Sequence, residues 1–245
     1  MSVAQVEAVT ESATAEDAPG GLTRDALRRM RRNPTAIVGV VLILLFVLVA
    51  VFAPLLAPYD PKFQRLDLIR PGQVPGPSSE FLLGLDALGR DELSRIIYGA
   101  RYSLLIGVVS LTLGAAGGLL LGLLAGAFGG WVDSLIMRIV DIMLAVPGLL
   151  LAIGVAALLG PRLLSVMIAI AVVNIPIFAR LLRGSMLAQR RSDYALAARS
   201  LGVTRGRVVL QHVFPNSLAP VIVQGTLALA TAIIEAAGLA YLGLG

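Results

Sequence analysis

The 245-residue chain has no cysteine, a single lysine (Lys62) and a single histidine (His212). Without cysteine, neither a disulfide framework nor a thiolate metal site can form. A nucleotide-binding loop of the G-x-x-x-x-G-K-[ST] type needs a lysine, and Lys62 lies outside any such pattern, in DPKFQ. His212 has no other metal-ligating residue near it in the sequence. Because no hydrolase motif and no acid–base pair of carboxylates occurs, the sequence predicts no catalytic residue, no metal site and no cofactor bound by this chain.

Charged side chains are also scarce. They make up 14% of the residues, against 57% hydrophobic residues, and the mean hydropathy is +0.87. Several uncharged runs are long enough to cross a bilayer as helices, so we predict an all-α, polytopic transmembrane helical bundle in contact with the lipid bilayer. The pI near 10.2 is also typical of nucleic-acid binding. However, the basic residues cluster beside apolar runs, where they fix membrane topology, and no nucleic-acid partner is expected.

The chain before residue 102 divides into three segments by composition. Residues 1–23 are small and polar, which predicts a disordered cytoplasmic tail. Residues 24–57 begin with five arginines, which place the N-terminus in the cytoplasm, and continue into an uncharged run over 35–57 that predicts a first, uncleaved transmembrane helix. Residues 58–101 carry six basic and six acidic side chains, and this balance predicts an extracytoplasmic segment.

The uncharged residues 102–132 predict a second span, and they carry a glycine at every fourth position. These glycines are Gly114, Gly118, Gly122, Gly126 and Gly130. On a helix they form one ridge without side chains, which allows a second helix to approach closely. We predict helix packing along this ridge, although Gly130 could instead belong to a turn.

Three further spans follow in this core, residues 102–245. The third opens in GGWVDSLIMRIVDIMLAVPGLLLAIG, where Arg138 and Asp141 can pair on one helix face. A short fourth span covers residues 163–179, and a fifth begins near Ser217.

Between the fourth and fifth spans lies a basic loop, residues 183–216, which the positive-inside rule assigns to the cytoplasm. Ser192 can cap a short helix through its hydroxyl, and Gly202 can end it. The helix carries four side chains on one apolar, shallow face: Tyr194, Ala197, Ala198 and Leu201. Thr204 then caps a second stretch that we expect to end before Pro215.

The sequence YALAARSLGVTRGRVVLQHVFPN closely resembles the EAA loop of binding-protein-dependent ABC importers. The match includes Ala197, Ala198, Gly202 and Pro215, whereas Leu196 occupies the position of the family's glutamate. In that family the loop forms a cytoplasmic coupling helix that docks on the ATPase subunit. The resemblance therefore implies a set of ATPase-coupling residues: Tyr194, Ala197, Ala198, Arg199, Leu201, Gly202 and Pro215. The alternative is a basic loop that only sets topology.

A second, independent resemblance lies in LLGLDALGRDELSRIIYGARYSL. It is similar to the entry to the second span in the dipeptide/oligopeptide/nickel subgroup of these permeases, with Leu85 in place of the subgroup's threonine. The ending EAAGLAYLGLG also resembles this subgroup, in which a sixth span follows. The implied fold is that of type I ABC importer permeases, with five spans visible and six expected, and the natural chain is expected to continue past Gly245.

Three residues are candidates for a translocation path or gate. Asn174 and Pro176 lie in the fourth span, where the proline predicts a kink either beside the path or in packed protein. Glu235 lies about 27 Å along the fifth span from Ser217, near the outer boundary. It could be a gate, a contact for the binding protein, or a solvated or lumen-facing structural carboxylate.

The resemblance implies a C-type permease subunit in a bacterial inner membrane, which forms half of an ATP-driven path for di- or oligopeptides. The implied partners are a homologous permease, two ABC ATPase subunits that bind ATP and Mg, and an extracytoplasmic substrate-binding protein. Nickel chelates or glutathione are alternative substrates. An ATPase-independent secondary transporter and a membrane scaffold are alternative classes, although secondary transporters often carry midplane charges that this chain lacks.

Overall fold

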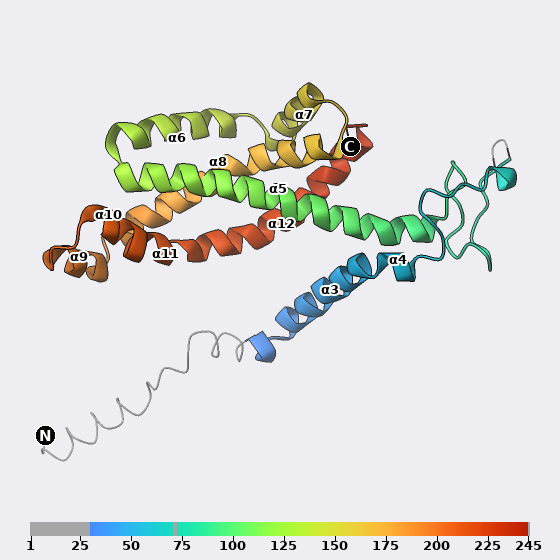
Figure 1. Cartoon of the computed structure of the whole chain (residues 1–245), viewed down its shortest axis with the longest axis horizontal. Helices are drawn as coiled ribbons and strands as arrows, with labels where there is room; N and C mark the ends of the chain where they lie inside the picture. Colours follow the sequence, from blue (N-terminus) through green and yellow to red (C-terminus); the bar gives the residue numbers. More distant parts are fainter. Residues whose placement is uncertain (1–29, 71–72, 245) are drawn as a thin grey trace, which may run out of the picture.

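The computed structural model describes residues 30–70 and 73–244, and every extended regular element within them is a helix (Figure 1). The predicted tail and the first arginines, Arg24, Arg28 and Arg29, lie outside the described residues. In chain order the helices are α3 (Pro34–Val51), α4 (Ala53–Leu56), the 3-10 turn η1 (Leu66–Leu68), α5 (Glu92–Phe128), α6 (Gly130–Ala145), α7 (Gly148–Leu159), α8 (Leu163–Gln189), α9 (Asp193–Ser200), α10 (Arg205–Val208), the π-helical turn η2 (Val209–Val213), α11 (Phe214–Asn216) and α12 (Leu218–Tyr241).

Four of these helices, α3, α5, α8 and α12, are long and apolar enough to cross a membrane. The predicted third span is instead broken into α6 and α7, whose axes differ by 93°. The break falls at Val146 and Pro147. The residue before a proline is driven into the extended region, and Val146 has φ −88° and ψ 130°. The predicted third span therefore counts as a span only if this bent pair of helices is taken as one, which makes five in the described residues.

Two helices extend beyond the predicted spans. Helix α5 begins at Glu92, ten residues before the predicted start at residue 102, so the last part of the predicted extracytoplasmic segment is helical. Helix α8 runs to Gln189, beyond the predicted end at residue 179, and includes Arg180 and Arg183. Because both residues are charged, the sequence predicted a loop here, but both side chains pair with aspartates of α6. Paired charges can remain on a long helix at much lower cost than isolated ones.

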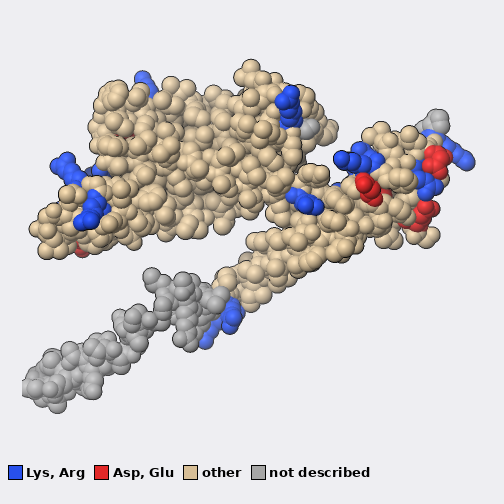
Figure 2. Space-filling model, in the orientation of Figure 1, with Lys and Arg blue, Asp and Glu red and all other residues tan. Residues whose placement is uncertain are grey.

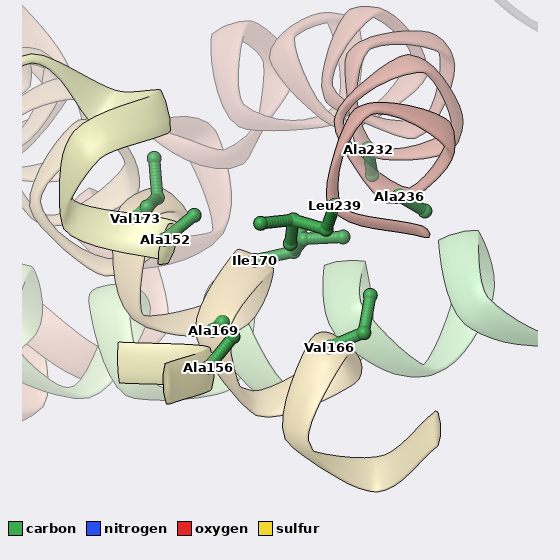
Figure 3. Packing of buried hydrophobic residues seen from close by; sticks show 9 residues of the cluster. All are labelled: Ala152, Ala156, Val166, Ala169, Ile170, Val173, Ala232, Ala236 and Leu239. Atoms are coloured by element: carbon green, nitrogen blue, oxygen red, sulfur yellow. The ribbon is translucent and has the colours of Figure 1, made fainter. Parts of the chain in front are cut away.

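The core of the molecule surrounds α8, which packs against α5, α7 and α12. Over its most apolar window, 61% of α8 is buried within the chain. Small and branched side chains of α7, α8 and α12 fill one end of this core, where Ile170 and Leu239 point toward one another (Figure 3). The largest side chains of the second cluster, Phe178, Leu182 and Met186, fill the end toward α9.

Helix α3 lies apart from this core and extends along one side of α5 (Figure 1). Asn33 caps it, because its Oδ1 accepts the Thr35 N–H at 3.0 Å, and Pro34 occupies the first helical position. Only 6% of its apolar window is buried. A helix that is apolar on every side and uncovered by its own chain is suited to a lipid environment or a partner helix.

Candidate coupling site

The predicted short helix of the basic loop is α9. Ser192 precedes it in an extended conformation, as a cap residue does, but its hydroxyl donates to the Gln189 carbonyl and does not cap α9. The predicted hydroxyl cap was therefore wrong. At the other end, Gly202 adopts a left-handed conformation with φ +80°. The Gly202 and Val203 N–H groups bond the Arg199 and Ala198 carbonyls, which is a Schellman motif, and here glycine avoids the strain of a side chain.

The four side chains predicted to share a face of α9 have different environments. Ala198 is half-buried and packs, with the fully buried Ala195, against the second core cluster. Tyr194, Ala197 and Leu201 face outward, and Leu201 is 84% exposed. The Tyr194 hydroxyl is held by Gln189 Oε1 at 2.6 Å. Helix α9 therefore attaches by one side and presents an apolar face on the other.

The stretch after Gly202 does not end before Pro215, as predicted, but stays helical into α12 through α10, η2 and α11. Thr204 stands at its start, yet its side chain makes no capping hydrogen bond to any described residue. A proline cannot donate to the preceding turn. The wider π-helical turn of η2 solves this problem, because it leaves Pro215 in the first turn of α11, where no donor is needed.

The loop is joined to the ends of α5 and α8. Three valines of α10 and η2 pack with α9 and the end of α8; they are Val208, Val209 and Val213. Arg190, directly after α8, donates from Nη2 to the Ala127 carbonyl near the end of α5, at 2.5 Å. A displacement of α9 would therefore move the ends of both long helices.

The predicted ridge of glycines on α5 lies against α8 and forms the glycine seam, defined by Gly114, Gly118, Gly122 and Gly126. All four meet residues of α8: Gly114 meets Ala171 and Asn174, Gly118 meets Ile175 and Phe178, Gly122 meets Ala179 and Leu182, and Gly126 meets Met186. A Cβ added at any of the four would lie within 2.8 Å of an atom of α8. The fifth glycine, Gly130, has φ +55° and open space around it, and it is the first residue of α6.

Helix α6 is tied to α8 by two ion pairs. Asp133 accepts two bonds from Arg183, at 2.5 and 2.6 Å, and the pair is half-buried. Asp141 pairs with Arg180, and both side chains are more than half exposed. The predicted pair of Arg138 with Asp141 was therefore wrong. The sequence could place Arg138 and Asp141 one turn apart, but it could not show that α8 brings a competing arginine.

Two family models match the sequence. One, described as binding-protein-dependent transport system inner membrane component, matches residues 118–245. The other, described as the N-terminal TM domain of oligopeptide transport permease C, matches residues 21–73. The first covers more than half of the chain, including α8 and α9. The chain belongs to this family of permeases.

Several relatives are similar to the permease over most of its length. The dipeptide transport system permease protein DppC of Alkalihalophilus pseudofirmus is 47% identical over 222 residues, which are 91% of this chain and 72% of the relative. The di/tripeptide transport system permease protein DppC of Pseudomonas aeruginosa is 48% identical over 215 residues, 87% of this chain and 71% of the relative. The glutathione transport system permease protein GsiD of Pectobacterium atrosepticum is 41% identical over 226 residues, 91% and 73% of the two chains.

The permease is thus a multi-pass, non-catalytic inner-membrane component of a binding-protein-dependent transport system, in a family that binds no cofactor. This family assignment replaces the alternatives of a secondary transporter and a scaffold. Among residues 30–70 and 73–244, no group of three or more His, Cys, Asp or Glu side chains could hold a metal ion.

The candidate pathway residues of the permease do not share one surface. Asn174 is buried beside Gly114 of the seam and donates from Nδ2 to the Ile170 carbonyl of its own helix, at 2.9 Å. Pro176 is also buried, and α8 continues through it as one helix. Glu235 of α12 is half-buried, and its Oε2 has no hydrogen-bond partner among the described residues. Asn174 and Pro176 therefore pack within the chain, whereas Glu235 keeps an unused polar atom.

The permease also contains a polar cluster that sequence reasoning recognised only as a resemblance. It centres on Asp86 of LGLDALGRDELSR. Its Oδ1 accepts the Leu88 and Arg90 N–H groups, each at 2.9 Å, and its Oδ2 pairs with the guanidinium groups of Arg90 and Arg95. Burial alone would raise the pKa of the Asp86 carboxyl, but these hydrogen bonds and the Arg90 charge lower it overall. The cluster therefore closes a rigid turn before α5.

The start of α5 is fixed by the next residues of the same motif. Asp91 Oδ2 accepts the Ser94 N–H at 2.8 Å and caps the helix. The Ser94 hydroxyl in turn accepts the Tyr59 N–H at 3.0 Å, which joins the chain leaving α4 to α5. Aspartate is a favoured residue at the N-cap of a helix, so Asp91 before an apolar run was a signal that the sequence alone carried.

Proposed function

We propose that this permease forms half of the translocation path of an ATP-driven importer of di- or oligopeptides. Two of the relatives described above are named for dipeptide or di/tripeptide transport, at 47% and 48% identity. The motif around Asp86 supports the same subgroup. A glutathione system is the second candidate, because relatives of that name are 41–44% identical. Glutathione is itself a small peptide, so both candidates share the same chemistry.

In this proposal the N-terminus and the loop carrying α9 lie in the cytoplasm, and the segment between α4 and α5 lies outside. The charge distribution supports this orientation. Basic side chains gather at the end of the molecule that carries α9 and α10, whereas acidic and basic side chains mix at the opposite end (Figure 2). An excess of arginine on one side of a membrane is typical of the cytoplasmic side.

The partners in this proposal are a homologous second permease, two ABC ATPase subunits and an extracytoplasmic substrate-binding protein. The ATPase subunits would bind ATP and Mg, which this chain has no motif to hold. Closure of the ATPases around ATP would displace α9, and the path would then switch between inward-open and outward-open states.

One observation carries the proposal: α9 exposes Tyr194, Ala197 and Leu201 while its other side is packed onto the ends of α5 and α8. The exposed face is small and apolar, as a helix that enters a cleft on another protein would be. Ala198 packs behind this face, Gly202 ends the helix and Pro215 lies in the connection to α12, whereas Arg199 is exposed.

Co-purification with the ATPase subunits tests this assignment. The tagged permease is expressed with its partner subunits, once intact and once with residues 193–201 replaced by a Gly/Ser segment of equal length. We expect the ATPase subunits to co-purify with the intact chain and to be lost with the replaced loop, while the second permease is retained. Equal recovery of the ATPase from both would contradict docking through α9.

The substrate is tested separately. The cognate binding protein, purified from cells without a refolding step, is expected to carry short peptides that mass spectrometry can identify. Recovery of glutathione alone would favour the second candidate, and recovery of a nickel chelate would contradict the peptide assignment.

A further inference from the structure

A basic cavity of about 830 Å³ lies between the ends of α5 and α8 and the loop that carries α9. Four arginines line it: Arg190, Arg191, Arg199 and Arg205. No carboxylate is among the lining residues, and none of the four forms an ion pair with an acid in the described ranges. Four positive charges around one cavity repel one another, so an anion in the cavity would stabilise them.

The rest of the cavity wall is apolar and continues along α5. Leu123, Leu124 and Phe128 line it, and Phe128 is 72% exposed. Leu124 lies four residues before Phe128 on α5, about 6 Å deeper along the helix. Arg190 and Arg191 directly follow the end of α8. The cavity thus has charged groups at the helix ends and an apolar wall toward the hydrocarbon, which is the polarity of a phospholipid.

Arg190 is held in the cavity wall by the chain itself. Its Nη2 is occupied by the Ala127 carbonyl, but its Nε is buried and has no partner among the described residues. Burial lowers the pKa of the Arg190 guanidinium, and repulsion from Arg199 and Arg205 lowers it further. An anion beside these guanidinium groups would offset their mutual repulsion and accept charge-assisted hydrogen bonds.

We propose that this cavity binds the phosphate headgroup of one anionic phospholipid from the cytoplasmic leaflet, with an acyl chain along Leu123 and Leu124 of α5. The proposal rests on the cytoplasmic orientation of the loop given above. Because Arg199 belongs to α9 and Arg190 follows α8, one headgroup would bridge the coupling helix and the core. The lipid would then stabilise α9 in its resting position against the core, from which closure of the ATPase subunits displaces it.

Native mass spectrometry of the assembled transporter tests the site, with phosphatidylglycerol as the probe and phosphatidylcholine of matched chains as the neutral comparison. The test variant is R191Q/R205Q, which leaves the bond from Arg190 to Ala127 intact. The control is R207Q, because Arg207 is exposed in the same loop and does not line the cavity. A third arm adds millimolar inorganic phosphate.

We expect one retained phosphatidylglycerol per permease chain, with affinity about 30-fold weaker in R191Q/R205Q, because each arginine near an anionic headgroup contributes roughly fivefold. R207Q should bind as the parent does, and phosphatidylcholine should not be retained. Equal retention in R191Q/R205Q would overturn the proposal, as would displacement of the lipid by inorganic phosphate. Absence of retained lipid in the parent would also overturn it, in favour of an acidic segment of a partner subunit. All walls of the cavity come from one chain, so this result is read independently of whether an ATPase co-purifies.

Discussion

The glycine seam and the outer face of α9 are both made of uncharged residues, but the chain itself covers only the seam. In the seam, four glycines of α5 lie directly against α8, and no additional methyl group fits. On α9, Ala197 and Leu201 face outward with nothing of the described chain over them. The first surface is completed within the chain, whereas the second is left for another molecule.

The difference shows that this membrane protein uses one kind of surface to hold its own helices together and another to dock on a partner. Inside lipid, apolar side chains gain little by leaving the hydrocarbon, so two helices are held by close approach and dispersion contacts along a bare ridge. In the aqueous loop, an exposed apolar face has a hydrophobic reason to be covered. A rigid pair of helices that carries an exposed coupling helix can transmit a displacement without bending.

The largest expected effect is loss of the folded chain on replacing Gly118. A Cβ at this position would lie 2.5 Å from the Phe178 Cβ and 2.6 Å from the Ile175 oxygen, so Gly118→Leu should cost more than about 3 kcal/mol and leave little folded protein. The measurement is the monodisperse fraction in size-exclusion chromatography. Gly99→Leu on the same helix is the control, because nothing lies within 4 Å of its Cβ position. Equal yields of the two variants would contradict close packing of α5 against α8 at the glycine seam.

The next effect concerns the outer face of α9 and should leave folding unchanged. Ala197→Glu places a charge on the exposed face, so we expect coupled transport to fall by tenfold or more, because a docked carboxylate loses its hydration. Transport and ATP hydrolysis are measured together in proteoliposomes that contain the assembled system. Gln211→Glu, exposed outside α9, is the matched control. Normal coupled uptake by the Ala197 variant would show that this face docks on nothing.

A smaller effect is expected at the end of α9. Valine at position 202 would have to adopt φ near +80°, which costs about 1–3 kcal/mol, and the chain would distort the end of the coupling helix to relieve it. We expect Gly202→Val to lower transport several-fold, and Gly202→Asn to retain more activity, since asparagine tolerates this conformation. Identical activities of the two variants would assign the effect to side-chain size and not to the backbone.

The smallest effect is expected at the polar cluster around Asp86. Like the glycine seam, this cluster is completed by residues of the same chain. Its pKa is lowered in the folded chain, so its stabilisation is complete above the ordinary value of 3.8 and is lost as pH falls through the lower folded-state value. Asp86→Asn should cost about 1–2 kcal/mol at neutral pH. The difference from the parent in thermal unfolding should disappear in acid. A difference that persists in strong acid would mean that shape, not charge, holds the turn.

The pattern of residues predicted much of this protein correctly. The apolar runs and their scarcity of charge led to an all-helical membrane protein, and the motifs around Asp86 and Ala197 led to the permease family that the comparisons identify. The helix over residues 193–200 followed from the spacing of its apolar residues and its end from the backbone freedom of Gly202, although Ser192 does not cap it as predicted. Errors occurred where a distant residue decides. Arg183 was assigned to a loop because its partner Asp133 lies 50 residues away.

The sequence by itself thus determined which segments suit lipid and where the coupling helix ends, because hydropathy and the backbone freedom of glycine depend on the residues of one segment. Only the tertiary structure decided which charges are paired, which side of α9 is exposed, and that four arginines share one cavity. These properties depend on the distance between side chains from separate helices, and composition and spacing along the chain do not fix that distance.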